Sequence, residues 1–239
     1  MPTNDSSDLS EVYLSNPRTL QFWASALVVL PVFLQAPWVH FYPLSALLFT
    51  FVLLGIGYFL CSTIDWKWSR VGSLLVGVSG SWLGGCLFWG WLRMHPVLHL
   101  PVEAVALPFA MLGLNTKWRI GAAFYLACLL GTAFTDVMMV FTGVMHQWPL
   151  VVNSSIQDAS QILNLTSLNL LNLPSVLLMI SAGVFILFIS DQMRKRGNLI
   201  NSLQGGAWLV ASAALTTTLW VDGLFFLTTL IQPTLSGLI

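Results

Sequence analysis

Charge is what this chain has least of. Only 8% of its 239 residues are Asp, Glu, Lys or Arg, whereas a soluble globular domain carries about 25% charged residues. Hydrophobic residues make up 56% of the chain, and the mean hydropathy is +0.81. This composition predicts an integral membrane protein whose surroundings are the lipid bilayer. Nine basic residues balance nine acidic ones, so no basic surplus points to a nucleic-acid partner.

Cysteine is also scarce. Cys61, Cys86 and Cys128 lie far apart without C-x-x-C spacing, so we expect small buried apolar residues and no disulfide framework. The chain contains no H-E-x-x-H, G-x-S-x-G, phosphate-loop or Rossmann motif, which favours a role other than catalysis. No basic stretch precedes the first apolar segment, so we expect no cleaved signal peptide.

Apolar segments of the roughly 20 residues that a membrane span needs occur seven times. They cover about 20–37, 44–63, 71–91, 97–115, 119–145, 173–191 and 203–231. Pro101 and Pro108 interrupt the fourth segment, which is either a full crossing kinked at Pro108 or a re-entrant half-helix. We predict an all-α, polytopic transmembrane helical bundle over 20–232, between a polar tail (1–19) and a short C-terminal tail (233–239).

The basic residues predict the orientation of this bundle, because cytoplasmic loops collect Lys and Arg. With seven crossings and a cytoplasmic N-terminus, every Lys and Arg except Arg93 falls on the inside, and the C-terminus lies outside. Most tryptophans then map to the two interfaces, where Trp concentrates. The charge pattern therefore favours a full crossing by the fourth segment.

Two further segments have sequence patterns that predict their position in the bundle. The third apolar segment carries small residues at four-residue spacing, such as Gly77, Ser81 and Gly85, which is typical of a helix packed closely against others. Residues 149–172 mix Ile and Leu with Asn, Gln and Ser and contain no Lys or Arg. This pattern predicts an amphipathic helix in the outer interface, which either caps a site or connects two spans.

Ionisable side chains collect at the turn between the third and fourth segments. Arg93, His95, His99 and Glu103 fall within eleven positions. On the predicted topology they share the outer half of the bundle with two acidic residues of the fifth and seventh segments, Asp136 and Asp222. Acidic residues inside spans usually face the bundle interior or a wet cavity. The sequence therefore predicts a polar, net-acidic cavity near the outer face, which would attract a cation or hold protons.

The four residues at this turn can also be explained without a functional site. Glu103 follows Pro101 by two positions, as expected of a helix N-terminus, and Arg93 has the length to snorkel to the head groups. His95 and His99 have the spacing of two metal ligands on a helix, but the prolines around them weaken that signal. Two threonines, Thr132 and Thr218, precede Asp136 and Asp222 by four residues and are expected to extend the polar seam.

Three stretches carry a resemblance to a known family. They are Gly-Trp-Leu-Arg93 followed by Pro-x-x-His-Leu-Pro-Val-Glu-Ala, then Gly131-Thr-Ala-Phe-Thr-Asp136, then Val221-Asp222-Gly-Leu-Phe-Phe. Together they resemble a cyanobacterial multipass membrane family catalogued only as a domain of unknown function. The resemblance covers about residues 20 to 230 and implies a thylakoid or plasma membrane. It brings no activity and no cofactor.

Three functions fit these observations. The first is a non-enzymatic binding or assembly factor of a photosynthetic membrane, which holds a pigment, a cation or a partner complex. The second is a proton- or cation-coupled small-molecule transporter, because carboxylates lie within the spans. The third is a metal enzyme with His and carboxylate ligands that acts on a lipid or quinone. The three remain open on the sequence.

Overall fold

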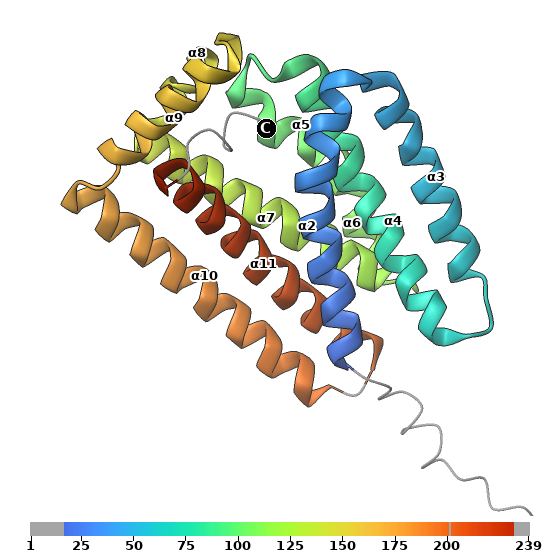
Figure 1. Ribbon diagram of the computed structural model, residues 1–239. Helices are drawn as coiled ribbons and strands as arrows, with labels where there is room; N and C mark the ends of the chain where they lie inside the picture. The colour runs from blue at the N-terminus through green and yellow to red at the C-terminus, as the bar shows by residue number, and fades with distance from the viewer. Residues whose placement is uncertain (1–16, 201, 232–239) are drawn as a thin grey trace, which may run out of the picture.

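A computed structural model describes residues 17–200 and 202–231, and every regular element within these ranges is helical. Figure 1 shows long helices that run up and down between two ends of the bundle. Most of the predicted N-terminal tail, and all of the C-terminal tail at 233–239, lie outside the described residues.

Seven helical segments in the described part are long and apolar enough to cross a membrane, as the hydropathy pattern predicts. Six of these segments contain one long helix each. Those helices are α2 (Pro17–Phe41), α3 (Pro43–Cys61), α4 (Trp66–Leu87), α7 (Arg119–Phe141), α10 (Leu173–Leu199) and α11 (Leu203–Ile231). The α4 segment ends in a π-helical turn, η1 (Phe88–Leu92).

The fourth candidate span, Pro96–Gly113, is built from four short pieces. They are the 3-10 turn η2 (Pro96–Leu98), α5 (His99–Glu103), the 3-10 turn η3 (Ala104–Ala106) and α6 (Leu107–Gly113). We expected one helix kinked at Pro108, and the break instead comes earlier, at η3. Proline has no N–H to bond to the carbonyl four residues before it and clashes with that carbonyl. The Ala104 carbonyl therefore accepts from the Leu107 N–H, which produces the tighter turn.

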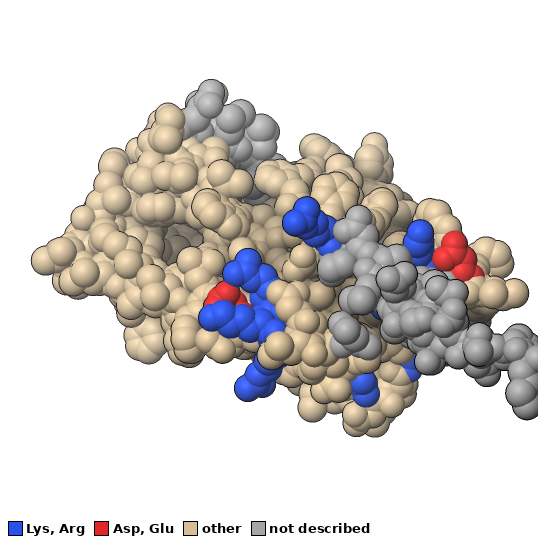
Figure 2. All heavy atoms as spheres, turned by 90° about the horizontal axis from the view of Figure 1, so that it is seen from below, with Lys and Arg blue, Asp and Glu red and all other residues tan. Residues whose placement is uncertain are grey.

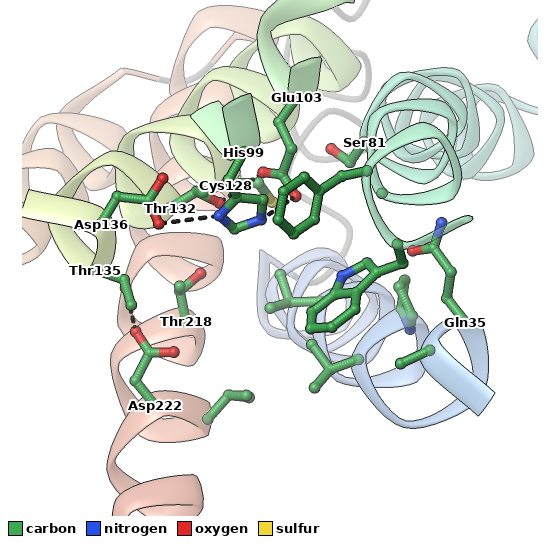
Figure 3. Close-up of a pocket in the computed structure, with 18 of the residues that line it drawn as sticks. Gln35, Ser81, His99, Glu103, Cys128, Thr132, Thr135, Asp136, Thr218 and Asp222 are labelled. Atoms are coloured by element: carbon green, nitrogen blue, oxygen red, sulfur yellow. Dashed lines mark hydrogen bonds and ion pairs between the residues drawn. The ribbon is translucent and has the colours of Figure 1, made fainter. Parts of the chain in front are cut away.

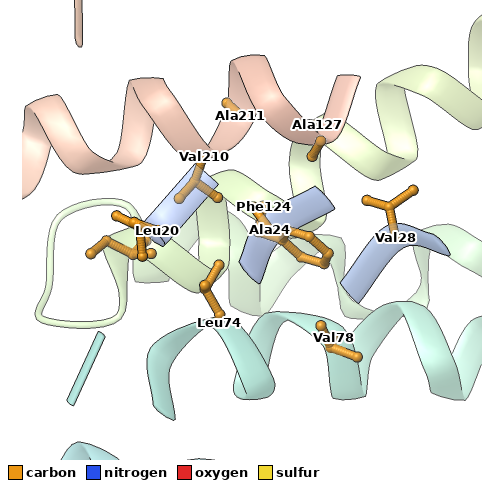
Figure 4. Packing of buried hydrophobic residues seen from close by; sticks show 11 residues of the cluster. Leu20, Ala24, Val28, Leu74, Val78, Phe124, Ala127, Val210 and Ala211 are labelled. Atoms are coloured by element: carbon orange, nitrogen blue, oxygen red, sulfur yellow. The ribbon is translucent and has the colours of Figure 1, made fainter. Parts of the chain in front are cut away.

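Four helices, α2, α4, α7 and α11, surround the core (Figure 4). Buried side chains from all four interlock there, including Ala24, Leu74, Phe124 and Val210. The α3 helix packs on α4, and α10 packs on α11. Both therefore lie outside this central group.

Glycines let α4 and α7 approach closely, as the small-residue pattern predicts. A Cβ atom on Gly77 would lie 2.2 Å from the Gly121 carbonyl oxygen, so only glycine fits there. The Gly121 N–H also donates to the Ser73 hydroxyl at 3.0 Å. Of the seven candidate spans, the one that contains α4 is the most buried.

The connection between α7 and α10 contains two helices, where the sequence predicts one. They are α8 (Trp148–Asn153) and α9 (Ile156–Asn169), preceded by the 3-10 turn η4 (Val144–His146). Ser155 caps α9 by accepting from the Asp158 N–H, which explains the break. The α9 helix also makes a polar contact with α11. The Ser167 and Thr229 hydroxyls lie 2.6 Å apart there.

Basic side chains gather at the end of the bundle where α4, α7 and α11 begin. Figure 2 shows this end, with Lys and Arg on its surface. Asp191 neutralises part of this charge, because it pairs with Arg194 at 2.8 Å and Lys195 at 2.7 Å. Arg93 follows η1 at the opposite end of α4. The predicted orientation depends on this difference in basic residues between the two ends of the bundle.

Candidate functional site

A cavity of about 340 Å³ lies between α2, α4, α5, α7 and α11, and η4 and α8 also contribute to its lining. That volume is at the small end of the range for ligand sites. Asp136 lines the cavity five residues before α7 ends, or roughly 7.5 Å from that end. The cavity therefore lies in the half of the bundle away from the basic end.

His99 stands between two carboxylates (Figure 3). Its Nδ1 atom is 3.0 Å from Oδ1 of Asp136, and its Nε2 atom is 3.2 Å from Oε1 of Glu103. The three side chains are mostly buried, with between 12% and 22% of their surface exposed. Glu103 and His99 come from the same short helix, whereas Asp136 reaches the imidazole ring from α7.

This arrangement limits the protonation states in which both contacts of His99 are hydrogen bonds. A neutral imidazole donates from one ring nitrogen and accepts at the other, whereas an imidazolium donates from both. Both contacts are hydrogen bonds only if His99 is an imidazolium between two carboxylates, or a neutral ring that accepts from one protonated carboxyl. These states differ only in the position of one proton between the ring and a carboxyl oxygen.

Hydroxyl groups complete the polar wall, and their partners differ from those the sequence predicts. Thr132 donates to Oε2 of Glu103 at 2.8 Å, and Thr135 donates to Oδ2 of Asp222 at 2.6 Å. Thr218 lines the cavity, but its hydroxyl donates to the Ala214 carbonyl of its own helix. The expected seam is therefore made by Thr135 in place of Thr218, because a helical Thr readily bonds back to the preceding turn.

Two carboxylate oxygens in the cavity have no hydrogen-bond partner among the described residues. They are Oδ2 of Asp136 and Oδ1 of Asp222, and both have accessible surface. A carboxylate accepts several hydrogen bonds, so these two oxygens are free to accept from a ligand. Neither lysine nor arginine is among the side chains that line the cavity within the described residues.

Close backbone packing sets the position of Glu103. A Cβ atom on Gly84 would lie 2.7 Å from the Glu103 Cα atom, so glycine allows α5 to lie directly against α4. The Tyr125 hydroxyl of α7 donates to the Glu103 carbonyl oxygen at 2.5 Å. The backbone of Glu103 is thus held by contacts with two of the core helices, α4 and α7.

The rest of the cavity lining is mainly apolar and aromatic. Trp89 and Trp148 lie with their ring centroids 5.5 Å apart, and Phe88 lies 4.3 Å from the His99 ring. Trp148 is held in place because its Nε1 donates to the Arg93 carbonyl oxygen at 2.7 Å. Gln35 lies opposite the acidic wall in Figure 3 and donates to the Trp82 carbonyl oxygen at 2.5 Å.

Two predicted site residues do not line the cavity. The Arg93 guanidinium lies 3.1 Å from Nδ1 of His40 at the end of the bundle. His95 is exposed and precedes η2 with φ −118° and ψ 79°, so it does not share a helical face with His99. The structure brings together His99, Glu103, Asp136 and Asp222 with Thr132 and Thr218.

A metal site would need a different arrangement of these groups. No set of three or more His, Cys, Asp or Glu side chains within the described ranges is placed to hold a metal ion. At this cavity the reason is that each ring nitrogen of His99 already faces a carboxylate oxygen, which leaves the ring no open coordination position.

Sequence reasoning missed three polar residues of the site, namely Gln35, Ser81 and Thr135. Gln35 was detectable as an amide within an apolar span that also contains Pro31 and Pro37. Thr135 had no comparable signal, because it directly precedes Asp136 and adjacent residues of a helix do not face each other. Ser81 belongs to the small-residue pattern of the third segment, which predicts packing and not a polar lining.

Comparison with known protein families gives a match over most of the chain. A family model described as "Protein of unknown function (DUF3120)" matches residues 24–230, in agreement with the resemblance to a family of unknown function. No curated protein and no solved structure matches the chain.

Proposed function

The chain belongs to the DUF3120 family, and because that description assigns no function, we propose one from the cavity: a non-enzymatic, multi-pass membrane protein that binds a small ligand between α2, α7 and α11. The observation that carries this proposal is the pair of free carboxylate oxygens, on Asp136 and Asp222, in a cavity of about 340 Å³. Unpaired polar groups in such surroundings are costly, and a bound ligand would satisfy them.

Mass spectrometry under non-denaturing conditions tests this proposal on full-length protein purified in mild detergent. We expect a retained small-molecule adduct that is lost in Val221→Trp, because Val221 lines the cavity. Leu224→Trp is the matched control, since Leu224 lies one turn further along α11 and is 55% exposed. An adduct that survives Val221→Trp, or a wild-type protein without one, would contradict the proposal.

A proton-coupled transporter is the second candidate, and the Glu103–His99–Asp136 cluster favours it. The cluster places an imidazole that can carry a proton between two carboxyl groups, so a cation that binds there would compete with that proton. The uptake of a small-molecule substrate into proteoliposomes, driven by a pH gradient, should then be abolished by Asp136→Asn and by Asp222→Asn. Wild-type uptake in both variants would eliminate proton coupling through these carboxylates, and no uptake by the wild-type protein would eliminate transport and leave the binding function.

The proposed orientation places the N-terminus in the cytoplasm and the cavity near the outer face. The basic end shown in Figure 2 supports it, because cytoplasmic ends are rich in Lys and Arg. Single cysteines introduced at Lys67 and at His95, in a cysteine-free background, test it with a membrane-impermeant thiol reagent. Labelling of the His95 position in intact cells, and of the Lys67 position only after lysis, is the expected result.

The sequence resemblance adds a cyanobacterial thylakoid or plasma membrane as the proposed location, with a photosynthetic complex as the proposed partner. Exposed aromatic side chains such as Phe51, Phe109 and Phe188 offer surface for such a partner. Co-purification of a tagged chain with a photosynthetic complex would support the assembly role. A monodisperse protein without a partner in mild detergent would argue for ligand binding alone.

A further inference from the structure

We infer that the ligand of this cavity is an organic ammonium ion with an aromatic or other apolar body, and that Asp222 receives its charge. This inference rests on the proposed binding function and names the ligand class. It depends on three features of the cavity, which are its uncompensated negative charge, its free acceptors and its aromatic wall.

The charge of the lining selects a cation. Glu103, Asp136 and Asp222 line the cavity, and His99 is the only basic side chain among the described residues that line it. Arg93 is directed to His40 instead. Even with a charged imidazole the lining carries a surplus of negative charge, which is costly at low dielectric unless a cation or protons balance it. An anionic ligand would add to that cost.

The distribution of hydrogen bonds selects Asp222 as the anchor. Oδ1 of Asp136 is engaged by His99, and both oxygens of Glu103 are engaged, by His99 and by Thr132. Asp222 has no cationic partner in the described part of the chain, and its Oδ2 atom accepts only from the neutral Thr135 hydroxyl. Its Oδ1 atom is free to accept from an ammonium N–H.

The remaining wall selects an ion with an apolar body. Phe225 lies on the same face of α11 as Asp222, and Trp89 and Trp148 lie together in the lining. An ammonium group next to aromatic rings gains cation–π attraction. A strongly hydrated inorganic ion would need a shell of oxygen ligands, which this aromatic wall does not provide. The volume of about 340 Å³ has room for a small arylalkyl ammonium ion.

Calorimetry on the full-length protein in detergent tests the inference with three probes. They are 2-phenylethylammonium, its neutral analogue 2-phenylethanol, and methylammonium, which has the charge without the ring. We expect 2-phenylethylammonium to bind about tenfold or more tightly than either of the others. We expect Asp222→Asn to weaken it by about tenfold or more, while leaving the neutral alcohol unchanged.

Asp191→Asn is the matched control, because Asp191 pairs with Arg194 and Lys195 outside the cavity. Equal affinity for the ammonium and the alcohol, unchanged ammonium binding in Asp222→Asn, or no binding of 2-phenylethylammonium would each overturn the inference. If an adduct is still lost in Val221→Trp in that case, the binding function stands and only the ligand class is wrong. If no adduct is retained, both fail.

Discussion

The Thr135 hydroxyl on α7 donates to Oδ2 of Asp222 on α11 at 2.6 Å, and so joins the two helices beside the cavity. Next to it, Gly131 lets the helices approach, since a Cβ atom there would lie 2.7 Å from the Thr218 side chain. The acidic wall of the site is thus continuous with one of the main packing contacts of the bundle. Substitutions in the wall are therefore expected to affect stability as well as binding.

Removing the Thr135 hydroxyl should weaken the contact between α7 and α11. We expect Thr135→Val to lower the free energy of unfolding by about 1 kcal/mol, the size of an interhelical hydrogen bond in membrane proteins, and Thr135→Ser to retain it. Thr142→Val is the control, because that hydroxyl bonds only within its own helix, to the Met138 carbonyl. Unfolding in mixed micelles measures the difference, and equal losses in the two valine variants would contradict the role of Thr135.

The two histidines near the start of the fourth span should differ sharply in their effect on stability. His99→Ala leaves two mostly buried carboxyl groups without their shared hydrogen-bonding partner, so we expect a loss of roughly 2–3 kcal/mol in the free energy of unfolding. His95→Ala should change it little, because His95 is exposed. Adding Asp136→Asn to His99→Ala should recover part of the loss, since one unpaired charge is removed. Similar losses for the two single variants would be incompatible with a His99-centred cluster.

The crossing of α4 and α7 should tolerate no side chain larger than glycine. Gly77→Ala places a methyl group against the Gly121 carbonyl, so we expect the overpacking cost of roughly 1–3 kcal/mol. Gly223→Ala meets no atom within 4 Å and should be neutral or stabilise α11 by up to about 1 kcal/mol. Thermal unfolding of the two variants side by side measures the contrast. A stable Gly77→Ala protein would mean that the helices can separate without cost.

Most of the architecture could be predicted from the sequence, because span length and hydropathy are local properties. The seven segments, the packed third helix and the acidic residues Asp136 and Asp222 all have local signals. The geometry of the fourth span was predicted only in part: Pro108 was identified as the cause of a kink, but the 3-10 turn that its missing N–H produces lies earlier, at Ala104–Ala106. Asp222 was predicted as a site residue from its depth along the seventh segment. Its hydrogen-bond partner Thr135 could be identified only from the structure.

The two predicted residues that do not line the cavity share one feature. Arg93 and His95 are near His99 in sequence, but both precede η2 and do not belong to the helix that contains His99. Proximity along a chain predicts proximity in space only within one regular helix. His99 and Glu103 do belong to one helix at four-residue spacing, and that pair meets in the structure at 3.2 Å.

Trp148 should control access to the cavity from the end formed by η4 and α8. Its Nε1–H bond to the Arg93 carbonyl holds α8 against the start of the fourth span, and Trp148 and Cys128 both line the cavity. In a background with Cys61→Ala and Cys86→Ala, Cys128 reports access through its rate of reaction with a maleimide. Trp148→Phe removes the hydrogen bond and keeps an aromatic ring. We expect labelling about fivefold faster, the factor that ~1 kcal/mol in a local opening equilibrium gives.

Trp220→Phe is the control for that measurement, because Trp220 is 66% exposed and does not line the cavity. Its labelling rate should equal that of the parent. A probe cation bound in the cavity should also slow labelling in the parent and slow it less in Trp148→Phe, because the opened state loses contacts to the ligand. If Trp148→Phe reacts no faster than the parent, α8 is only a connection between two spans and the cavity fills from another side.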